Sequence, residues 1–160
     1  MKRYMVLELI DNQDEEKLSF KHLEAVCRYI SRKFDPDNKK VVNIIFIDDG
    51  TMREMNREYR NIDRTTDVLS FSYLDGSIGQ EKTGSHNIIG EVYISPATAR
   101  KNSSQQESQW DLMLEIILLV IHGTLHIFGY DHEKEDEKAQ MYNIQDSLMH
   151  DIRGKDWKRY

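Results

Sequence analysis

Residues 110–128 constrain the fold most strongly, because their apolar run has to be buried away from water. Within this segment, residues 113–121 are apolar except for Glu115. The run is too short to cross a bilayer, which takes about 20 apolar residues in a helix. It therefore predicts a buried central helix, and the chain then leads directly into a group of histidines.

Short β-branched segments alternate with helical patterns in the rest of the chain. Residues 41–47 read VVNIIFI and predict a buried strand. Further strands are predicted at residues 4–10, 68–73 and 88–94, and further helices at residues 14–34, 51–60, from Pro96 onward and 134–152. Residues 75–87 hold three glycines and predict a loop. We expect one α+β domain spanning residues 1–160, in which a small mixed sheet of about four strands packs with helices.

The start of the helix at residues 51–60 has two candidate caps. Thr51 and Glu54 match a capping box, and Asp49 is an equally good N-cap residue.

The charge balance excludes a protein that coats nucleic acid by bulk charge. There are 22 basic and 28 acidic residues, for a net charge of −6. Contact with a polyanion would need a local basic patch or a metal ion. The best patch is an arginine series at spacings of four, three and four: Arg53, Arg57, Arg60 and Arg64. A second patch is the basic tail, with Arg153, Lys155, Lys158 and Arg159. Glu54 and Glu58 interleave with the arginines, so a salt-bridged surface is the alternative interpretation.

The single cysteine, Cys27, excludes an intramolecular disulfide and a cysteine-based zinc site. The N-terminal segment has too short an apolar run for a signal peptide, and no segment is long enough for a membrane span. We therefore expect a soluble intracellular domain.

Three histidines within eleven residues, His122, His126 and His132, form the strongest chemical signal. On a helix, His122 and His126 lie one turn apart on the same face. Gly129 lies where the helix should end, and a glycine there can take a positive φ and reverse the chain toward His132. Three neutral imidazoles leave one tetrahedral position open, which is typical of a catalytic zinc site; nickel or cobalt would also suit these ligands.

Other interpretations of the histidines remain open. The first pair could be merely hydrogen-bonded, and a closed structural zinc site could recruit Asp131 as a fourth ligand. The spacing also matches the zincin-like metzincin peptidases, but Gly123 replaces the glutamate that serves them as general base. A zinc peptidase is therefore disfavoured.

Three blocks of the sequence resemble the bacterial YbeY family. The histidine block reads HGTLHIFGYDH, residues 56–63 followed by 66–71 read NREYRNID and TDVLSF, and residues 90–95 read GEVYIS. The sequence departs from the family pattern at Thr65 and Ser72, where proline is usual, and at Glu91, where aspartate is usual. None of these positions is a candidate ligand.

The resemblance implies a single-strand-specific, metal-dependent endoribonuclease of the bacterial cytoplasm. Such a protein would mature the 3′ end of small-subunit ribosomal RNA and act in ribosome quality control. Its partners would be single-stranded RNA, the small ribosomal subunit and ribosome-associated proteins. The resemblance also implies one metal ion, usually zinc, on His122, His126 and His132, and a role in activity for Arg60. The alternative is an assembly factor that binds RNA without cutting it and keeps the metal for structure.

Chemical reasoning adds further candidate residues around this site. Arg60 could clamp phosphate oxygens, and Arg57 and Arg64 could extend that contact. Thr66 and Ser70 could hydrogen-bond a phosphate, although both suit ordinary cap and strand positions. Asp131 could orient a ligand histidine, act as general base or stabilise the turn, and orientation is the first choice.

Overall fold

The computed structural model describes residues 6–34, 40–74, 88–103 and 109–155. Its strands are β1 (Val6–Asn12), β2 (Val41–Ile47), β3 (Val68–Ser72) and β4 (Ile88–Ile94). Its helices are α1 (Phe20–Phe34), α2 (Asp49–Arg60), α3 (Pro96–Ser103), α4 (Gln109–Ile127) and α5 (Glu135–Arg153). The expected α+β architecture is confirmed. The predicted loop at residues 75–87 and the tail residues Lys158 and Arg159 lie outside the described part of the chain.

The four strands form one mixed sheet in the order β1-β2-β4-β3. β1, β2 and β4 are mutually parallel, whereas β3 pairs antiparallel with β4. In this register Leu69 lies opposite Tyr93 and Ser70 opposite Val92. Because side chains alternate along a strand, Val92 and Ser70 lie on one face of the sheet and Tyr93 and Leu69 on the other.

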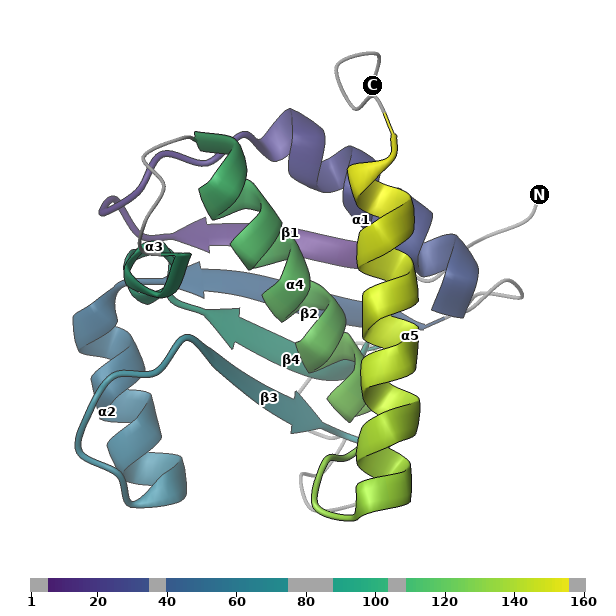
Figure 1. Ribbon diagram of the computed structural model, residues 1–160. Coiled ribbons are helices and arrows are strands. Elements are labelled where there is room, and N and C mark those ends of the chain that lie inside the picture. Colours follow the sequence, from purple (N-terminus) through teal and green to yellow (C-terminus); the bar gives the residue numbers. More distant parts are fainter. Residues whose placement is uncertain (1–5, 35–39, 75–87, 104–108, 156–160) are drawn as a thin grey trace.

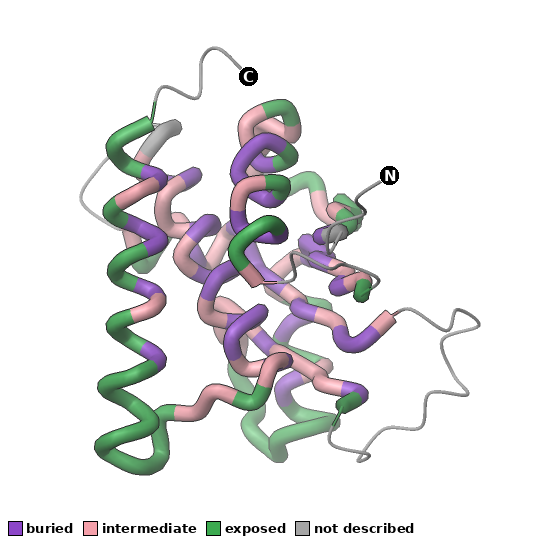
Figure 2. Tube along the Cα trace, turned by 90° about the vertical axis from the view of Figure 1, so that its right-hand side faces the viewer, coloured by how far each residue is buried: buried purple, intermediate pink, exposed green. Residues whose placement is uncertain are grey.

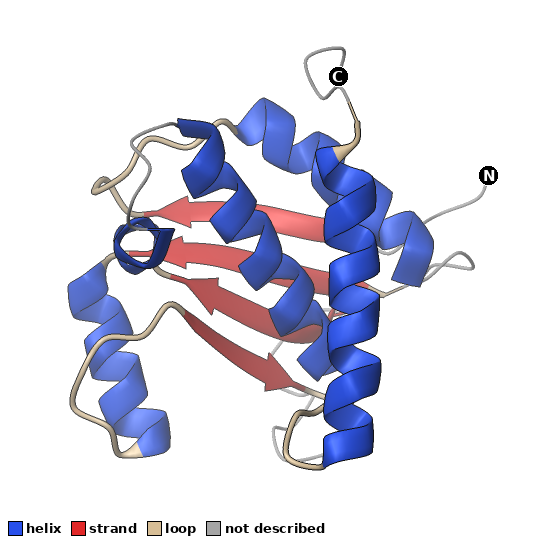
Figure 3. Ribbon diagram, in the orientation of Figure 1, coloured by secondary structure: helices blue, strands red, loops and turns tan. Residues whose placement is uncertain are grey.

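Helices cover the two faces unequally. The main hydrophobic core joins one face of the sheet to α1, α4 and α5, and Figure 1 shows α4 and α5 running across the front of the strands. A smaller cluster on the opposite face joins Ile45, Ile47 and Leu69 to Met52 of α2. The sheet thus separates α4 from α2, and Figure 3 shows α2 beside the strand ends rather than across them.

Two glycines allow α4 to approach the sheet closely. A β-carbon on Gly123 would lie 2.5 Å from Cγ1 of Val92 and 2.9 Å from Oγ of Ser70. A β-carbon on Gly90 would lie 2.7 Å from Cδ1 of Ile127 and 2.8 Å from the carbonyl oxygen of Phe71. Larger residues at these positions would push the helix away from β3 and β4.

α1 begins later than predicted. Gln13 and Glu16 exchange two hydrogen bonds, from the Gln13 amide to the Glu16 carbonyl at 2.9 Å and from the Glu16 N–H to the Gln13 amide oxygen at 2.8 Å. These bonds hold a turn at residues 13–16, and no helix begins there. The helix starts at Phe20, whose ring packs edge-on against Phe46 with centroids 6.0 Å apart.

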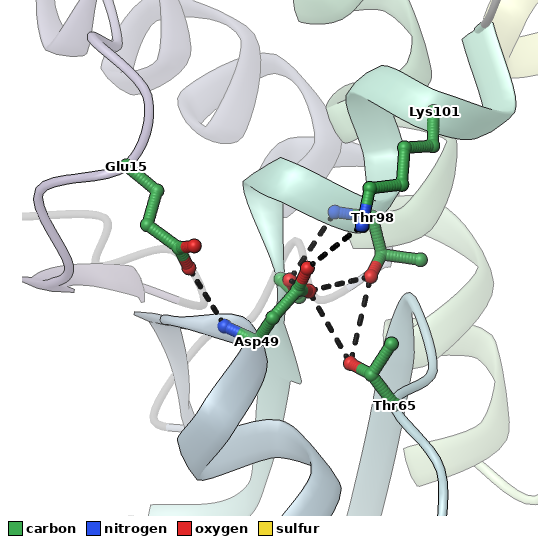
Figure 4. A network of polar contacts seen from close by, with 6 residues as sticks. Glu15, Asp49, Thr65, Thr98 and Lys101 are labelled. Carbon is green, nitrogen blue, oxygen red and sulfur yellow. Dashed lines mark hydrogen bonds and ion pairs between the residues drawn. The ribbon is translucent and has the colours of Figure 1, made fainter.

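The N-cap of α2 is neither of the two predicted residues. It is Asp48, whose side chain accepts a hydrogen bond from the Thr51 N–H at 2.7 Å. Asp49 instead forms the centre of a polar network that Figure 4 shows from close by. Its Oδ1 accepts from the hydroxyls of Ser95 (2.5 Å), Thr98 (2.6 Å) and Thr65 (3.2 Å), and its Oδ2 from Lys101 (3.2 Å). The network fastens the start of α2 to the start of α3.

Candidate active site

The three sequence-predicted histidines come together in space. One ring nitrogen from each of His122, His126 and His132 lies within 4.8 Å of the other two. His122 and His126 are half-buried on α4, whereas His132 is exposed and follows the helix. Among the described residues, this is the group suited to holding a metal ion.

The chain reversal that brings His132 to the other two rings depends on Gly129. Gly129 has φ of +94°, as predicted from its position after the helix. Its N–H donates to the His126 carbonyl at 3.0 Å, and the Tyr130 N–H donates to the Leu125 carbonyl at 3.1 Å. This pair of bonds is a Schellman motif, which satisfies the last carbonyls of α4 and turns the chain back.

A further hydrogen bond holds each of the two helix histidines. Nδ1 of His122 lies 3.1 Å from Oε1 of Gln145 on α5, and the His126 ring has a backbone hydrogen bond at Tyr130. Their inner nitrogens therefore converge, and the two Nε2 atoms are 3.1 Å apart. A tetrahedral ion with bonds of about 2.0–2.1 Å would separate two ligand nitrogens by roughly 3.3 Å.

The surroundings favour the neutral form of both helix histidines. Burial lowers the pKa of His122 and of His126, and the neighbouring histidine rings lower both further. A metal ion needs a deprotonated nitrogen, so neutral rings are ready to bind. The donor set therefore fits a divalent ion that accepts imidazole, such as zinc.

One carboxyl group that acts on the histidines was not singled out from the sequence. Asp67, just before β3, raises the pKa of His122 by its negative charge. Burial raises the pKa of Glu115, and the charge of Asp67 raises it further. Glu115 precedes His122 by seven residues and so lies on the same face of α4. The negative charge of Asp67 therefore acts on both His122 and Glu115.

The arginine candidates lie across the sheet from the histidines. Arg57 and Arg60 are exposed on α2, and Arg64 is exposed in the segment that follows. Arg53 is paired with Asp63 at 2.9 Å, which supports the salt-bridged interpretation for that one member of the series. The Arg64 carbonyl accepts a hydrogen bond from the buried Asn56 side chain at 2.8 Å. The segment after α2 is therefore anchored by this bond, while the Arg64 side chain is exposed.

An exposed aromatic residue lies among these arginines. The Tyr59 side chain is 58% exposed, although its ring meets Phe71 edge-on with centroids 5.1 Å apart. Phe71 in turn meets Tyr93 at 5.8 Å. Sequence reasoning singled out the neighbouring arginines and missed Tyr59, because its exposure depends on how α2 packs against β3.

The remaining candidates occupy less open positions. Ser70 lies under α4, where a side chain on Gly123 would meet its hydroxyl. Thr66 lies 3.5 Å from its neighbour Asp67, oxygen to oxygen. Asp131 accepts a hydrogen bond from the backbone N–H of His132 at 2.7 Å. Its parts in orienting a ligand histidine, as a general base and in stabilising the turn stay predictions.

The fold and the site define an α+β protein with a trihistidine cluster at the end of a central helix. The model of the family described as Endoribonuclease YbeY matches residues 9–153, and the chain belongs to this endoribonuclease family. The family resemblance found in the sequence is thereby confirmed, and with it the assignment as an RNA endonuclease. None of the helices in the described ranges is long and apolar enough to cross a membrane.

Relatives match over most of their length. The chain is 32% identical to Endoribonuclease YbeY of Desulforamulus reducens over 147 residues, covering 88% of this chain and 94% of that protein. It is 35% identical to Endoribonuclease YbeY of Persephonella marina over 140 residues, covering 87% of each. Among solved structures, the solution structure of TM1509 from Thermotoga maritima has a TM-score of 0.60 and 25% identity, over 93% of this chain and 90% of that one.

Proposed function

We propose that this chain is a metal-dependent endoribonuclease that cuts single-stranded RNA and matures the 3′ end of small-subunit ribosomal RNA in the bacterial cytoplasm. The convergence of three imidazole nitrogens within 4.8 Å supports the metal dependence most directly. The family assignment supports RNA as the substrate. The ribosomal target, a part in ribosome quality control and ribosome-associated partners rest on the resemblance of the sequence blocks to the family.

The metal-binding residues in this proposal are His122, His126 and His132, with one zinc ion per chain. An ion held there would act as a Lewis acid toward a phosphate oxygen and make water acidic enough to serve as nucleophile near neutral pH. The histidines supply neutral nitrogen donors, and Gln145 and the backbone at Tyr130 keep two of them aimed inward. Asp131 holds the turn that carries His132.

The RNA-binding residues in this proposal lie on and after α2. The guanidinium groups of Arg57, Arg60 and Arg64 contact phosphates, and the exposed Tyr59 ring offers a surface on which a base can stack. An RNA molecule that reaches both these side chains and the histidines would pass β3, the strand at the edge of the sheet. Single-stranded RNA suits this path, because it bends more readily than a duplex and has unpaired bases to stack.

Metal content and RNA cleavage, measured on the same preparation, test the proposal. We expect about one metal ion per chain by elemental analysis and cleavage of a labelled single-stranded RNA that stops on chelation and returns with zinc. A duplex of the same sequence is the control and should stay intact. Bound metal without cleavage, in preparations free of other nucleases, would favour the assembly factor that binds without cutting. Cleavage of casein by the pure protein would instead revive the peptidase.

A further inference from the structure

Gln145 is a polar residue on the buried side of α5. The other buried positions of this helix are apolar: Met141, Leu148, Met149 and Ile152. Figure 2 shows these buried positions recurring along one side of an otherwise largely exposed helix. The Gln145 side chain is only 7% exposed, and packing alone would favour leucine or methionine there. A buried amide at such a position requires a hydrogen-bonding partner.

The partner is a candidate metal ligand. Oε1 of Gln145 lies 3.1 Å from Nδ1 of His122, across 23 residues of sequence and between two helices. An amide oxygen only accepts hydrogen bonds, so Nδ1 must carry the proton in this contact. The proton on Nδ1 leaves the lone pair on Nε2, which is the nitrogen that faces His126.

We infer that Gln145 is a positioning residue that fixes the tautomer and the ring orientation of His122, so that Nε2 is presented to the metal ion. This inference rests on the proposed metal site. Ligand histidines usually donate their other N–H to a carboxylate, a carbonyl or water, and loss of such a partner lowers metal affinity by about 10- to 100-fold. Here a neutral amide takes the place of the carboxylate. It orients the ring without adding a negative charge beside that of Asp67, which already acts on His122.

Three variants separate positioning from a purely structural role. Gln145→Leu removes the acceptor and places an apolar side chain against the core. Gln145→Glu keeps an acceptor. Gln140→Leu changes an exposed glutamine of the same helix. Zinc affinity is measured by competition with a chromophoric chelator, and thermal unfolding is measured on the metal-free proteins. We expect Gln145→Leu to bind zinc about 10- to 100-fold more weakly without loss of metal-free stability. Gln145→Glu should bind at least as tightly as the unchanged chain, and Gln140→Leu should bind equally.

The tautomer itself is observable in the unchanged protein. Long-range proton–nitrogen NMR spectra of the zinc-loaded chain should show the His122 proton on Nδ1. A proton on Nε2, or unchanged zinc affinity in Gln145→Leu, would overturn the inference and leave the metal site standing. If the unchanged chain bound no zinc, the proposed site and this inference would fall together.

Discussion

Gly123 of α4 lies so close to Val92 of β4 that a β-carbon would come within 2.5 Å of the valine Cγ1. The metzincin glutamate would have to occupy this position. No side chain fits at position 123, because α4 rests directly on the sheet there. Ser70 of β3 also lies against this position. Packing therefore requires a glycine at position 123. The same glycine removes the general base of the peptidase motif.

Gly123→Ala should destabilise the protein by about 1–3 kcal/mol, because the added methyl group overpacks the contact between helix and sheet. Gly50→Ala is the matched control, because Gly50 is at an exposed position of α2. A β-carbon there would have Oδ1 of Asp48 as its nearest neighbour, at an ordinary contact distance of 3.5 Å. That variant should be neutral or more stable by up to about 1 kcal/mol. Urea unfolding measures both, and equal stabilities for the two variants would contradict the close packing.

His126→Ala should abolish metal retention, because two imidazoles remain where three converge. His150→Ala, which removes an exposed histidine from α5, serves as the control and should keep the metal. Elemental analysis after gel filtration gives the stoichiometry. Full metal content in His126→Ala would show that the ion is held elsewhere.

Arg60→Glu should leave metal binding intact and lower the cleavage of single-stranded RNA by about 10- to 100-fold, the loss expected for one charge-assisted contact to phosphate. Arg28→Glu makes the same charge change on the exposed side of α1 and should cleave normally. Initial cleavage rates at matched metal content make the comparison. Normal cleavage by Arg60→Glu would return Arg60 to an ordinary surface role.

Asp49→Asn should lower stability at neutral pH by about 1–2 kcal/mol. Burial alone would raise the pKa of Asp49, but the hydrogen bonds from Ser95, Thr98 and Lys101 hold it below its ordinary value of 3.8. A lowered folded-state pKa gives stability that is present above the unfolded-state pKa and lost as pH falls through the folded-state value.

The difference between Asp49→Asn and the unchanged chain should therefore be constant from pH 7 to about pH 5 and shrink below about pH 4. Unfolding free energies of both proteins, measured across this pH range, show whether the stability difference shrinks or grows on acidification. Asp146→Asn, at an exposed position of α5, should show little change at any pH. A difference that grew on acidification would contradict the network.

Cys27 should not react with thiol reagents in the folded protein. Burial raises the pKa of its thiol to about 12, so the reactive thiolate is scarce and is also inaccessible. Reaction with a disulfide reagent at pH 8 should therefore follow global unfolding and speed up with added urea. A fast reaction that urea does not affect would show that the side chain is reached in the native state.

The sequence predicted most of the fold and the histidine cluster, because these depend on local patterns. The strand at residues 41–47 and the helix carrying His122 and His126 follow from hydrophobic periodicity, and the turn at Gly129 follows from the conformational freedom of glycine. The start of α1 was misplaced because side-chain hydrogen bonds of Gln13 favour a turn over a helix.

Contacts between distant elements could not be predicted in this way. Gln145 looks like any polar residue of an amphipathic helix until α5 is packed against α4. Asp49 looks like a cap until the start of α3 is placed beside it. In both cases the partner is more than 20 residues away, and no local pattern encodes such a pairing.

The strand order has a consequence for how the protein emerges during synthesis. β4 lies between β2 and β3, so β3 has no strand to pair with until residues 88–94 have been made. Both helix histidines come later still, on a helix that needs the finished sheet as its support. Folding from the N-terminus would thus complete the sheet before the proposed metal site. A nascent chain could bind an ion at that site only after His132 had been translated.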